Sequence, residues 1–275
     1  MRSLLKIEWL KIKKYPAFWW MLLIVTFTYP GTTLLSYYAY TKSIRGKEMT
    51  NTIAKMLLGN PFAFPETWHS VAFLSSFFIL IPSLLVIMLV TNEYTFKTQR
   101  QNIIDGWSRA QFVTSKLADV IIISLVCTLM YTAVATGIGI YSDPDNIGRW
   151  MEQLHYIPLF FLQTFAQLSL AFLLGFLIKK AFIALGIFLF YNLVLENIAV
   201  GYAKLKHFDT IGKFLPFEVS DRIIPMPAFM NRFGKEMKEA YEKAIDAIPE
   251  QVCYTLILTT AVWALCYYLQ KRRDL

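Results

Sequence analysis

The chain has 275 residues, of which 56% are hydrophobic and only 17% are charged, whereas a soluble domain carries about 25% charged residues. The apolar residues lie in long blocks, which excludes an ordinary soluble domain and indicates that lipid is part of the solvent. The net charge is +8, but the basic residues flank the apolar runs as they do in membrane proteins, so we expect no nucleic-acid partner.

The first residues, Met1–Pro16, are predicted to form an interfacial helix. Apolar and basic residues fall on adjacent faces at helical spacing, with Leu5, Trp9 and Ile12 on one and Arg2, Lys6 and Lys13 on the other. Such a helix lies in the membrane surface and directs its lysines at anionic lipid headgroups. The alternative is a charged flank that only fixes the topology.

Six apolar runs are long enough to cross about 30 Å of hydrocarbon as helices. They are Ala17–Tyr40, Val71–Val90, Leu117–Tyr141, Tyr156–Ile178, Ala181–Tyr202 and Val252–Leu269. Pro30 and Pro82 fall within the first two runs, where a kink is tolerated if neighbouring helices satisfy the freed carbonyl groups. The sequence therefore predicts an all-α membrane protein with six transmembrane helices.

The distribution of Lys and Arg predicts that both termini are cytoplasmic. Of the 27 basic residues, 14 lie in four short pieces: Met1–Pro16, Thr91–Lys116, Lys179–Lys180 and Gln270–Leu275. One domain, 1–275, then comprises an interfacial helix (1–16), spans one and two (17–92), a cytoplasmic segment (93–116), spans three to five (117–202), an extracytoplasmic segment (203–250), and span six with a cytoplasmic tail (251–275).

The segment Glu93–Lys116, EYTFKTQRQNIIDGWSRAQFVTSK, is polar yet rich in signals of order. Its first half is predicted to continue span two as a helix that ends at Gly106, because glycine readily takes the left-handed conformation at a helix end. Ser108 and Gln111 then have the spacing of a capping box, which begins the next helix. We expect a helix, a tight break and a new helix; the alternative is an amphipathic turn on the bilayer surface.

This segment resembles the membrane subunits of ABC exporters of the second type (the ABC-2 family). The resembling pattern is carried by Glu93, Thr98, Arg100, Ile103, Gly106, Ser108, Arg109, Phe112 and Lys116, and the opening MRSLLKIEWLKIKKYPAFW is also similar to the start of that family. The resemblance implies that the segment is a coupling helix that docks on an ATPase subunit. The implied ATPase-coupling residues are Glu93, Thr98, Arg100, Ile103, Gly106, Trp107, Ser108, Arg109 and Phe112.

The resemblance also implies a permease of a bacterial cytoplasmic membrane that exports a lipid, a peptide or another amphipathic substrate. Its partners would be two copies of an ABC ATPase subunit, a second permease chain in a homo- or heterodimer, and membrane lipids. The chain lacks the G-x-x-x-x-G-K-[ST] phosphate-binding loop, so we expect no enzymatic activity and no cofactor here, with ATP and Mg²⁺ bound by the ATPase.

The segment 203–250 is too long for a simple connection. Its second half places Met237, Tyr241, Ala244 and Ile248 on one face of an amphipathic helix. Its first half, FLPFEVSDRIIPMPAF, combines apolar residues with three prolines. The residues predict an ordered outer cap, and the resemblance implies short helices that dip into the outer leaflet.

Polar residues within the spans form two pairs, each one helical turn apart: Gln163 with Gln167, and Asn192 with Glu196. Intramembrane polar residues face the interior of a helix bundle, so these four either line a substrate path or join helices by hydrogen bonds. The three cysteines lie in apolar runs and the three histidines are far apart, so neither a metal site nor a catalytic site is expected.

Two other classes of function were weighed. An intramembrane enzyme would need paired acids, a histidine cluster or a Ser–Lys dyad at membrane depth, which the sequence does not offer. An ion-coupled secondary transporter would need carboxylates near the membrane midplane. Glu196 lies about 24 Å of helical rise beyond Lys180, which places it nearer the outer interface.

Overall fold

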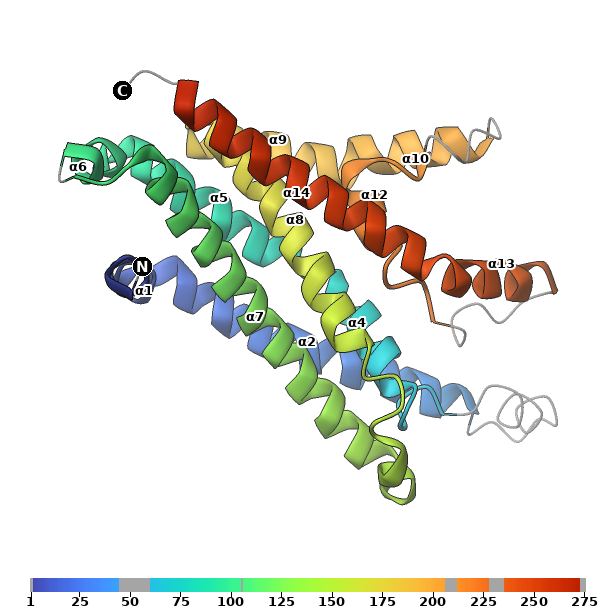
Figure 1. The fold of residues 1–275 in the computed structure, drawn as a ribbon. Helices are drawn as coiled ribbons and strands as arrows, with labels where there is room; N and C mark the ends of the chain where they lie inside the picture. Colours follow the sequence, from blue (N-terminus) through green and yellow to red (C-terminus); the bar gives the residue numbers. More distant parts are fainter. Residues whose placement is uncertain (1, 45–59, 105, 206–211, 228–234, 273–275) are drawn as a thin grey trace.

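The computed structural model describes residues 2–44, 60–104, 106–205, 212–227 and 235–272 (Figure 1). These residues form helices joined by turns and contain no strand, which confirms the predicted all-α fold. Figure 1 shows the interfacial helix α1, the short helix α6 and the end of α14 at one end of the bundle, and α13 toward the other. This arrangement is the one expected if both termini are on the same side of the membrane.

Five helices are long and apolar enough to cross a membrane, and a bent pair makes a sixth crossing if it is counted as one span. The five are α2 (Pro16–Ile44), α7 (Arg109–Ser142), α8 (Tyr156–Ile178), the helical stretch Ala181–Ala203, and α14 (Ile248–Arg272). The bent pair is α4 (Thr67–Ser76) and α5 (Leu80–Thr95). The protein is therefore a multi-pass membrane protein with five or six spans.

Span two is not one helix over Val71–Val90, as the apolar run suggested. α4 and α5 meet at an angle of 48°, with the break at residues 77–79. Pro82 has no N–H to donate to the carbonyl of Phe78, and its ring would clash with that carbonyl. The Phe78 carbonyl accepts instead from Ile81 N–H at 3.1 Å. The proline thus breaks the helix one turn before its own position.

α8 is the central helix of the bundle. It packs against α5, α7 and α14, and 13 of its 23 residues are buried. Its close contact with α5 is made at Gly175, where a Cβ atom would lie 3.4 Å from the backbone of Ile87. An alanine at that position would therefore make ordinary van der Waals contact with α5.

Span five contains a wide turn at its middle. α9 (Ala181–Phe190) passes into a π-helical turn, η2 (Tyr191–Leu195), and then into α10 (Glu196–Leu205). The side-chain amide of Asn197 donates to the carbonyls of Asn192 and Leu193, both at 3.1 Å. π-Helical turns within α-helices occur frequently at functional sites.

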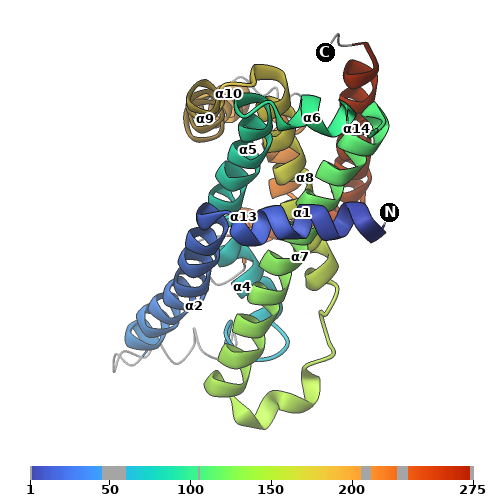
Figure 2. The same cartoon turned by 90° about the vertical axis from the view of Figure 1, so that its left-hand side faces the viewer.

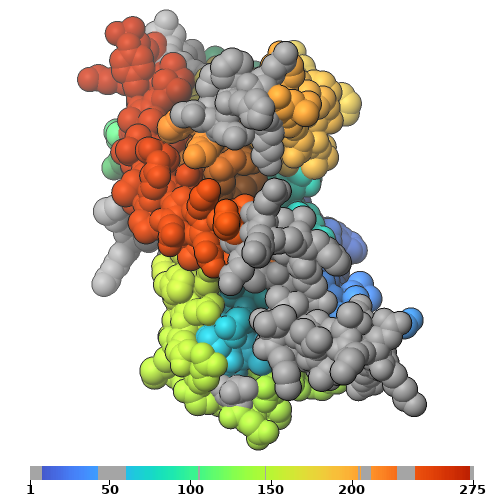
Figure 3. Space-filling model, turned by 90° about the vertical axis from the view of Figure 1, so that its right-hand side faces the viewer, coloured from blue at the N-terminus to red at the C-terminus, as the bar shows by residue number. Residues whose placement is uncertain are grey.

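The outer segment is ordered in two described parts. α12 (Pro216–Asp221) packs against α8 and α14, and Figure 3 shows its orange surface between α14 and α10. α13 (Lys235–Asp246) is the predicted amphipathic helix. Its Tyr241 and Ala244 are half-buried, whereas Glu242 and Lys243 are exposed. The side chain of Met237 lies outside the described residues.

α1 (Arg2–Lys14) confirms the predicted N-terminal helix, but the residues of its apolar face differ in burial. Figure 2 shows α1 lying across α7 and steeply inclined to α2. Ile12 is buried against the bundle, while Trp9 is 43% exposed. Leu5 lies among the residues whose side chains are not described. The helix therefore contacts the protein with one part of its surface and leaves Trp9 free for lipid.

The predicted topology can be tested with single cysteines at Lys97 and Lys243, both exposed and at opposite ends of the bundle. The background would lack Cys127, Cys253 and Cys266, because Cys253 is itself exposed. In intact cells we expect an impermeant thiol reagent to label Lys243→Cys and not Lys97→Cys, and permeabilised cells to label both. Labelling of both variants in intact cells would contradict the assigned orientation.

Candidate functional site

The segment between spans two and three has two breaks rather than the one predicted. α5 ends at Thr95, Lys97 takes a left-handed φ of 56°, and the separate helix α6 (Thr98–Ile104) follows. The prediction of one continuous helix from Glu93 to Asp105 is therefore wrong. The last turn of α5 closes locally, with Lys97 N–H donating to the Tyr94 carbonyl at 3.3 Å. Asp105 lies outside the described residues.

The second break and the following helix start are as predicted. Gly106 has a φ of 101°, which glycine adopts at little cost. Gln111 N–H donates to Ser108 Oγ at 3.2 Å, and Ser108 N–H donates to Gln111 Oε1 at 2.7 Å. This reciprocal capping box begins α7 at Arg109, eight residues before the predicted start of span three at Leu117. The polar segment is thus two ordered helix ends joined by α6, which Figure 2 shows crossing between them.

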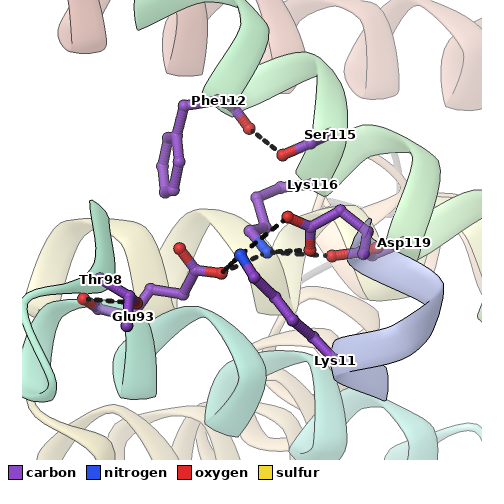
Figure 4. A network of polar contacts seen from close by, with 8 residues as sticks. Lys11, Glu93, Thr98, Phe112, Ser115, Lys116 and Asp119 are labelled. Atoms are coloured by element: carbon purple, nitrogen blue, oxygen red, sulfur yellow. Dashed lines mark hydrogen bonds and ion pairs between the residues drawn. The ribbon is translucent and has the colours of Figure 1, made fainter. Parts of the chain in front are cut away.

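A buried lysine holds this region to the bundle (Figure 4). The ammonium group of Lys116 lies 2.6 Å from Glu8 Oε2, 2.7 Å from Glu93 Oε1 and 3.1 Å from Asp119 Oδ2. The Lys116 side chain is 4% exposed. Since Glu8 is on α1, Glu93 on α5 and Lys116 on α7, one ammonium group joins three elements.

Lys11 forms the outer part of the same network. Its ammonium group lies 3.1 Å from Glu8 Oε1 and 3.2 Å from Glu93 Oε1, and its side chain is 35% exposed. The five residues Glu8, Lys11, Glu93, Lys116 and Asp119 are called the ion-pair network below. Two ammonium groups face three carboxylates, and Glu93 Oε2 and Asp119 Oδ1 are buried without a hydrogen-bond partner in the described structure.

The electrostatics of Glu8 follow from this arrangement. Burial raises the pKa of the Glu8 carboxyl, but the charge of Lys116, its hydrogen bond and the charge of Lys11 together outweigh burial and hold the pKa below its ordinary value of 4.5. The charged form of Glu8 is therefore the form that stabilises the contact between α1 and α7.

The nine residues of the predicted coupling set are not equally accessible. Arg100, Gly106 and Ser108 are exposed, and Thr98, Ile103, Trp107 and Arg109 are partly exposed. Glu93 and Phe112 are buried, at 6% and 0% exposure, so they support the segment and contribute no outer surface. Arg109 Nη1 donates to the Lys271 carbonyl at 3.0 Å, which ties the start of α7 to the end of α14.

Two exposed apolar side chains lie outside the predicted coupling set. Phe96 is 72% exposed and Ile104 is 83% exposed, and they flank α6 at its two ends. Ile104 belongs to an apolar pair with Ile103, and only the fold determines which of the two faces outward. The outer surface of the segment therefore combines apolar residues with basic ones.

The four polar residues predicted within spans four and five meet in one place. Gln163, Gln167, Asn192 and Glu196 all line a cavity of about 340 Å³. The amide groups of Gln163 and Gln167 donate to Asp221 Oδ1 at 2.9 and 2.7 Å. Glu196 Oε1 accepts from Glu218 N–H at 2.6 Å. The structure thus joins the two predicted pairs through α12.

A family model described as "Protein of unknown function (DUF2705)" matches residues 23–275. The chain belongs to the DUF2705 family. No curated protein matches this sequence. The matched region begins within α2 and includes both the cavity and most of the ion-pair network, but not Glu8 or Lys11, which lie on α1.

Sequence reasoning missed the ion-pair network and the part of the cavity on α12. A signal for the network exists: Lys116 and Asp119 are three residues apart where span three begins, and Glu8 is an isolated acid within a basic helix. Ionisable residues at the edge of an apolar run are costly unless paired. For Asp221 the sequence offers no comparable signal, because its partners come from another element.

Removal of the central cation should destabilise the fold. Lys116→Met leaves Glu8, Glu93 and Asp119 facing one another in a buried site, and breaking a buried ion pair in this way costs about 3–5 kcal/mol. We expect a lower unfolding midpoint for the purified variant in detergent. The double variant Lys116→Met with Glu93→Gln should recover part of the loss, because one unpaired charge is gone. An unchanged midpoint for Lys116→Met would show that the network contributes no stability.

The lowered pKa of Glu8 predicts a pH dependence of stability. A carboxyl whose pKa is lower in the folded state binds protons more readily when unfolded, so its contribution is present above about pH 4.5 and is lost as the pH falls through the folded value. We expect the unfolding midpoint of the wild type to fall more steeply below that pH than the midpoint of Glu8→Gln. Parallel curves for the two proteins would contradict this assignment.

Proposed function

We propose that this chain is the membrane-spanning permease subunit of an ABC exporter of the second type, driven by a separate ATPase. In this proposal it resides in a bacterial cytoplasmic membrane, pairs with a second permease chain and moves an amphipathic substrate outward. The proposal rests on the resemblance of residues 93–116 to that class and on the order of an interfacial helix, spans and outer cap along the chain.

The observation that carries the proposal is the exposed surface formed by α6 and the residues that flank it. Phe96 is the residue that caps α5 and Ile104 ends α6, and both are more exposed than almost any other apolar side chain of the described chain. The left-handed residues Lys97 and Gly106 bound α6 itself. Exposed apolar side chains rimmed by polar ones mark binding surfaces. Arg100 and Gln101 are also exposed on this helix. A partner with an apolar groove and an acidic rim would complement it.

The ion-pair network connects this surface to spans two and three. α6 follows α5 after a two-residue break and leads through residues 105–108 into α7, while Lys116 joins α5 and α7 below it. A displacement of α6 by an ATPase would therefore move spans two and three as one unit with α1. Closure of two ATPases on ATP would switch a pair of such bundles between inward- and outward-facing states, by the rigid-body route common to such transitions.

A second candidate is an ion-coupled secondary transporter. It is favoured by the broken span two, the π-helical turn in span five and the carboxylate of Glu196 beside a cavity, because secondary transporters build their sites from interrupted helices and buried acids. Transport in liposomes that follows an ion gradient without any ATPase would select this candidate over the first.

The docking surface can be tested with the double variant Phe96→Asp and Ile104→Asp. From membranes of the source cells, the tagged wild type should co-purify with an ATPase of the ABC class. The double variant should lose it by roughly tenfold or more, because two carboxylates would have to enter an apolar contact. Met151→Asp is the matched control, since Met151 is 66% exposed and lies beyond the other end of α7.

Other outcomes identify the alternatives. If α6 lies on the bilayer surface, the double variant will bind anionic vesicles less well and its ATPase yield will stay unchanged. Absence of any ATPase from wild-type preparations, or ATP turnover by the chain freed of all other subunits, would contradict the permease assignment.

A further inference from the structure

The cavity between α8, α10 and α12 has a polar floor and an apolar wall. Gln163, Gln167, Glu196 and Asp221 line one part, and aromatic and aliphatic side chains line the rest, among them Phe73, Phe77, Leu80 and Phe188. A site of this composition suits a ligand with a polar head and an apolar body.

The ionisable side chains that line the cavity are all acidic. Glu218 also lines it, but Arg222 neutralises Glu218 through a 2.7 Å ion pair. Glu196 and Asp221 form no ion pair with any side chain that the structure describes. Glu196 accepts from the backbone N–H of Glu218, and Asp221 accepts from the two glutamine amides. Two carboxylates thus face one cavity and are held by neutral donors.

Two acceptor atoms at the cavity lack a partner. Glu196 is 5% exposed and its Oε2 is unpaired, and Gln163 is 1% exposed and its Oε1 is unpaired, within the described structure. Exchanging the nitrogen and oxygen of the Gln163 amide does not satisfy the second acceptor, because the nitrogen must face the Asp221 carboxylate. Buried acceptors without donors are costly. Hydrogen bonds between helices occupy Gln163 Nε2 and Glu196 Oε1 but leave these two acceptor atoms unsatisfied.

We propose that this cavity binds the ammonium or guanidinium head of a cationic amphiphile. The head would supply the donors that Glu196 Oε2 and Gln163 Oε1 lack and the positive charge that faces Glu196 and Asp221. The apolar body would lie against Phe73, Phe77 and Phe188. The aromatic rings of these residues would also attract the cationic head. This inference rests on the proposed export function and deepens it by naming the chemical class of the substrate.

The position of the cavity fits entry from the outer half of the membrane. Gln163 and Gln167 lie about 10 and 16 Å of helical rise from Tyr156, the start of α8. Phe77 is 64% exposed at the break of span two, and Leu193 is 57% exposed at the wide turn of span five. Both line the cavity. Its mouth is therefore bordered by the two interrupted spans, at a depth where an amphiphile would lie among lipid chains.

The test uses the full chain in nanodiscs of phosphatidylcholine and a dodecylamine that carries a diazirine on its alkyl chain. After irradiation, labelled peptides are identified by mass spectrometry. We expect labelling of α10 and α12 by the amine to exceed labelling by the matching dodecanol by roughly tenfold, since a charge-assisted hydrogen bond is lost with the alcohol. Equal labelling by amine and alcohol, or labelling confined to other helices, would overturn the proposal.

Matched variants test the residues. Glu196→Gln and Asp221→Asn keep the shape of each side chain and remove its charge, and each should reduce amine labelling by about tenfold. Glu152→Gln is the control, because Glu152 is exposed in the outer turn and pairs with Arg149. Unchanged labelling in both cavity variants would overturn the assignment of the carboxylates. If a variant does not fold, the comparison of amine with alcohol on the wild type still decides.

Two competitors distinguish the sources of the cationic head. Phosphatidylethanolamine added to the nanodiscs will compete if the ligand is a lipid headgroup, and a lysine-rich amphipathic peptide will compete if the ligand is a peptide. The assay contains no ATPase, so its result is independent of the proposed coupling function. Absence of ATPase co-purification would refute the exporter assignment and leave the cation site standing. Equal labelling by amine and alcohol would refute the cation site and leave the exporter assignment standing.

Discussion

The burial of Lys116 is the constraint on which the end of the bundle that carries α1 and α6 depends. An ammonium group that is 4% exposed would cost several kcal/mol without compensating carboxylates. Its partners come from α1, α5 and α7 itself, so these three elements must meet at this point. Glu8 and Lys116 are 108 residues apart along the chain. The packing of α1 is therefore a requirement of the bundle.

The position of α6 follows from this constraint. A helix of seven residues is not stable by itself in water. It is held because α5 is fixed through Glu93, α7 begins at a complete capping box, and Arg109 binds the last turn of α14. Phe96, at the end of α5, and Ile104, at the end of α6, are therefore presented on ordered backbone, which would avoid the loss of conformational entropy that a slack loop would incur in the proposed binding.

Features that depend on neighbours in sequence were predictable, and features that depend on distant partners were not. The capping box at Ser108 and the left-handed Gly106 were foreseen because each is specified within a few residues. The left-handed Lys97 was not, since lysine has no preference for that conformation. Glu93 was assigned to the ATPase-coupling set although it is buried, because its partner Lys116 is brought to it only by packing. The polar pairs of spans four and five were recognised individually, but their connection through Asp221 and Glu218 of α12 depends on how α12 lies against α8.

α5 is the element that connects the two polar regions of the molecule. Its 16 residues span about 24 Å, with Glu93 in the ion-pair network at one end and Leu80 at the cavity on the other. The other half of span two is fixed to span three, because Tyr131 Oη donates to the Trp68 carbonyl at 2.8 Å. The break at residues 77–79 therefore lies between two attachments of span two to α7, one at Tyr131 and one at Lys116. In the proposed coupling, a displacement of α6 would therefore reach the cavity through α5, because Leu80, the first residue of α5, lines that cavity.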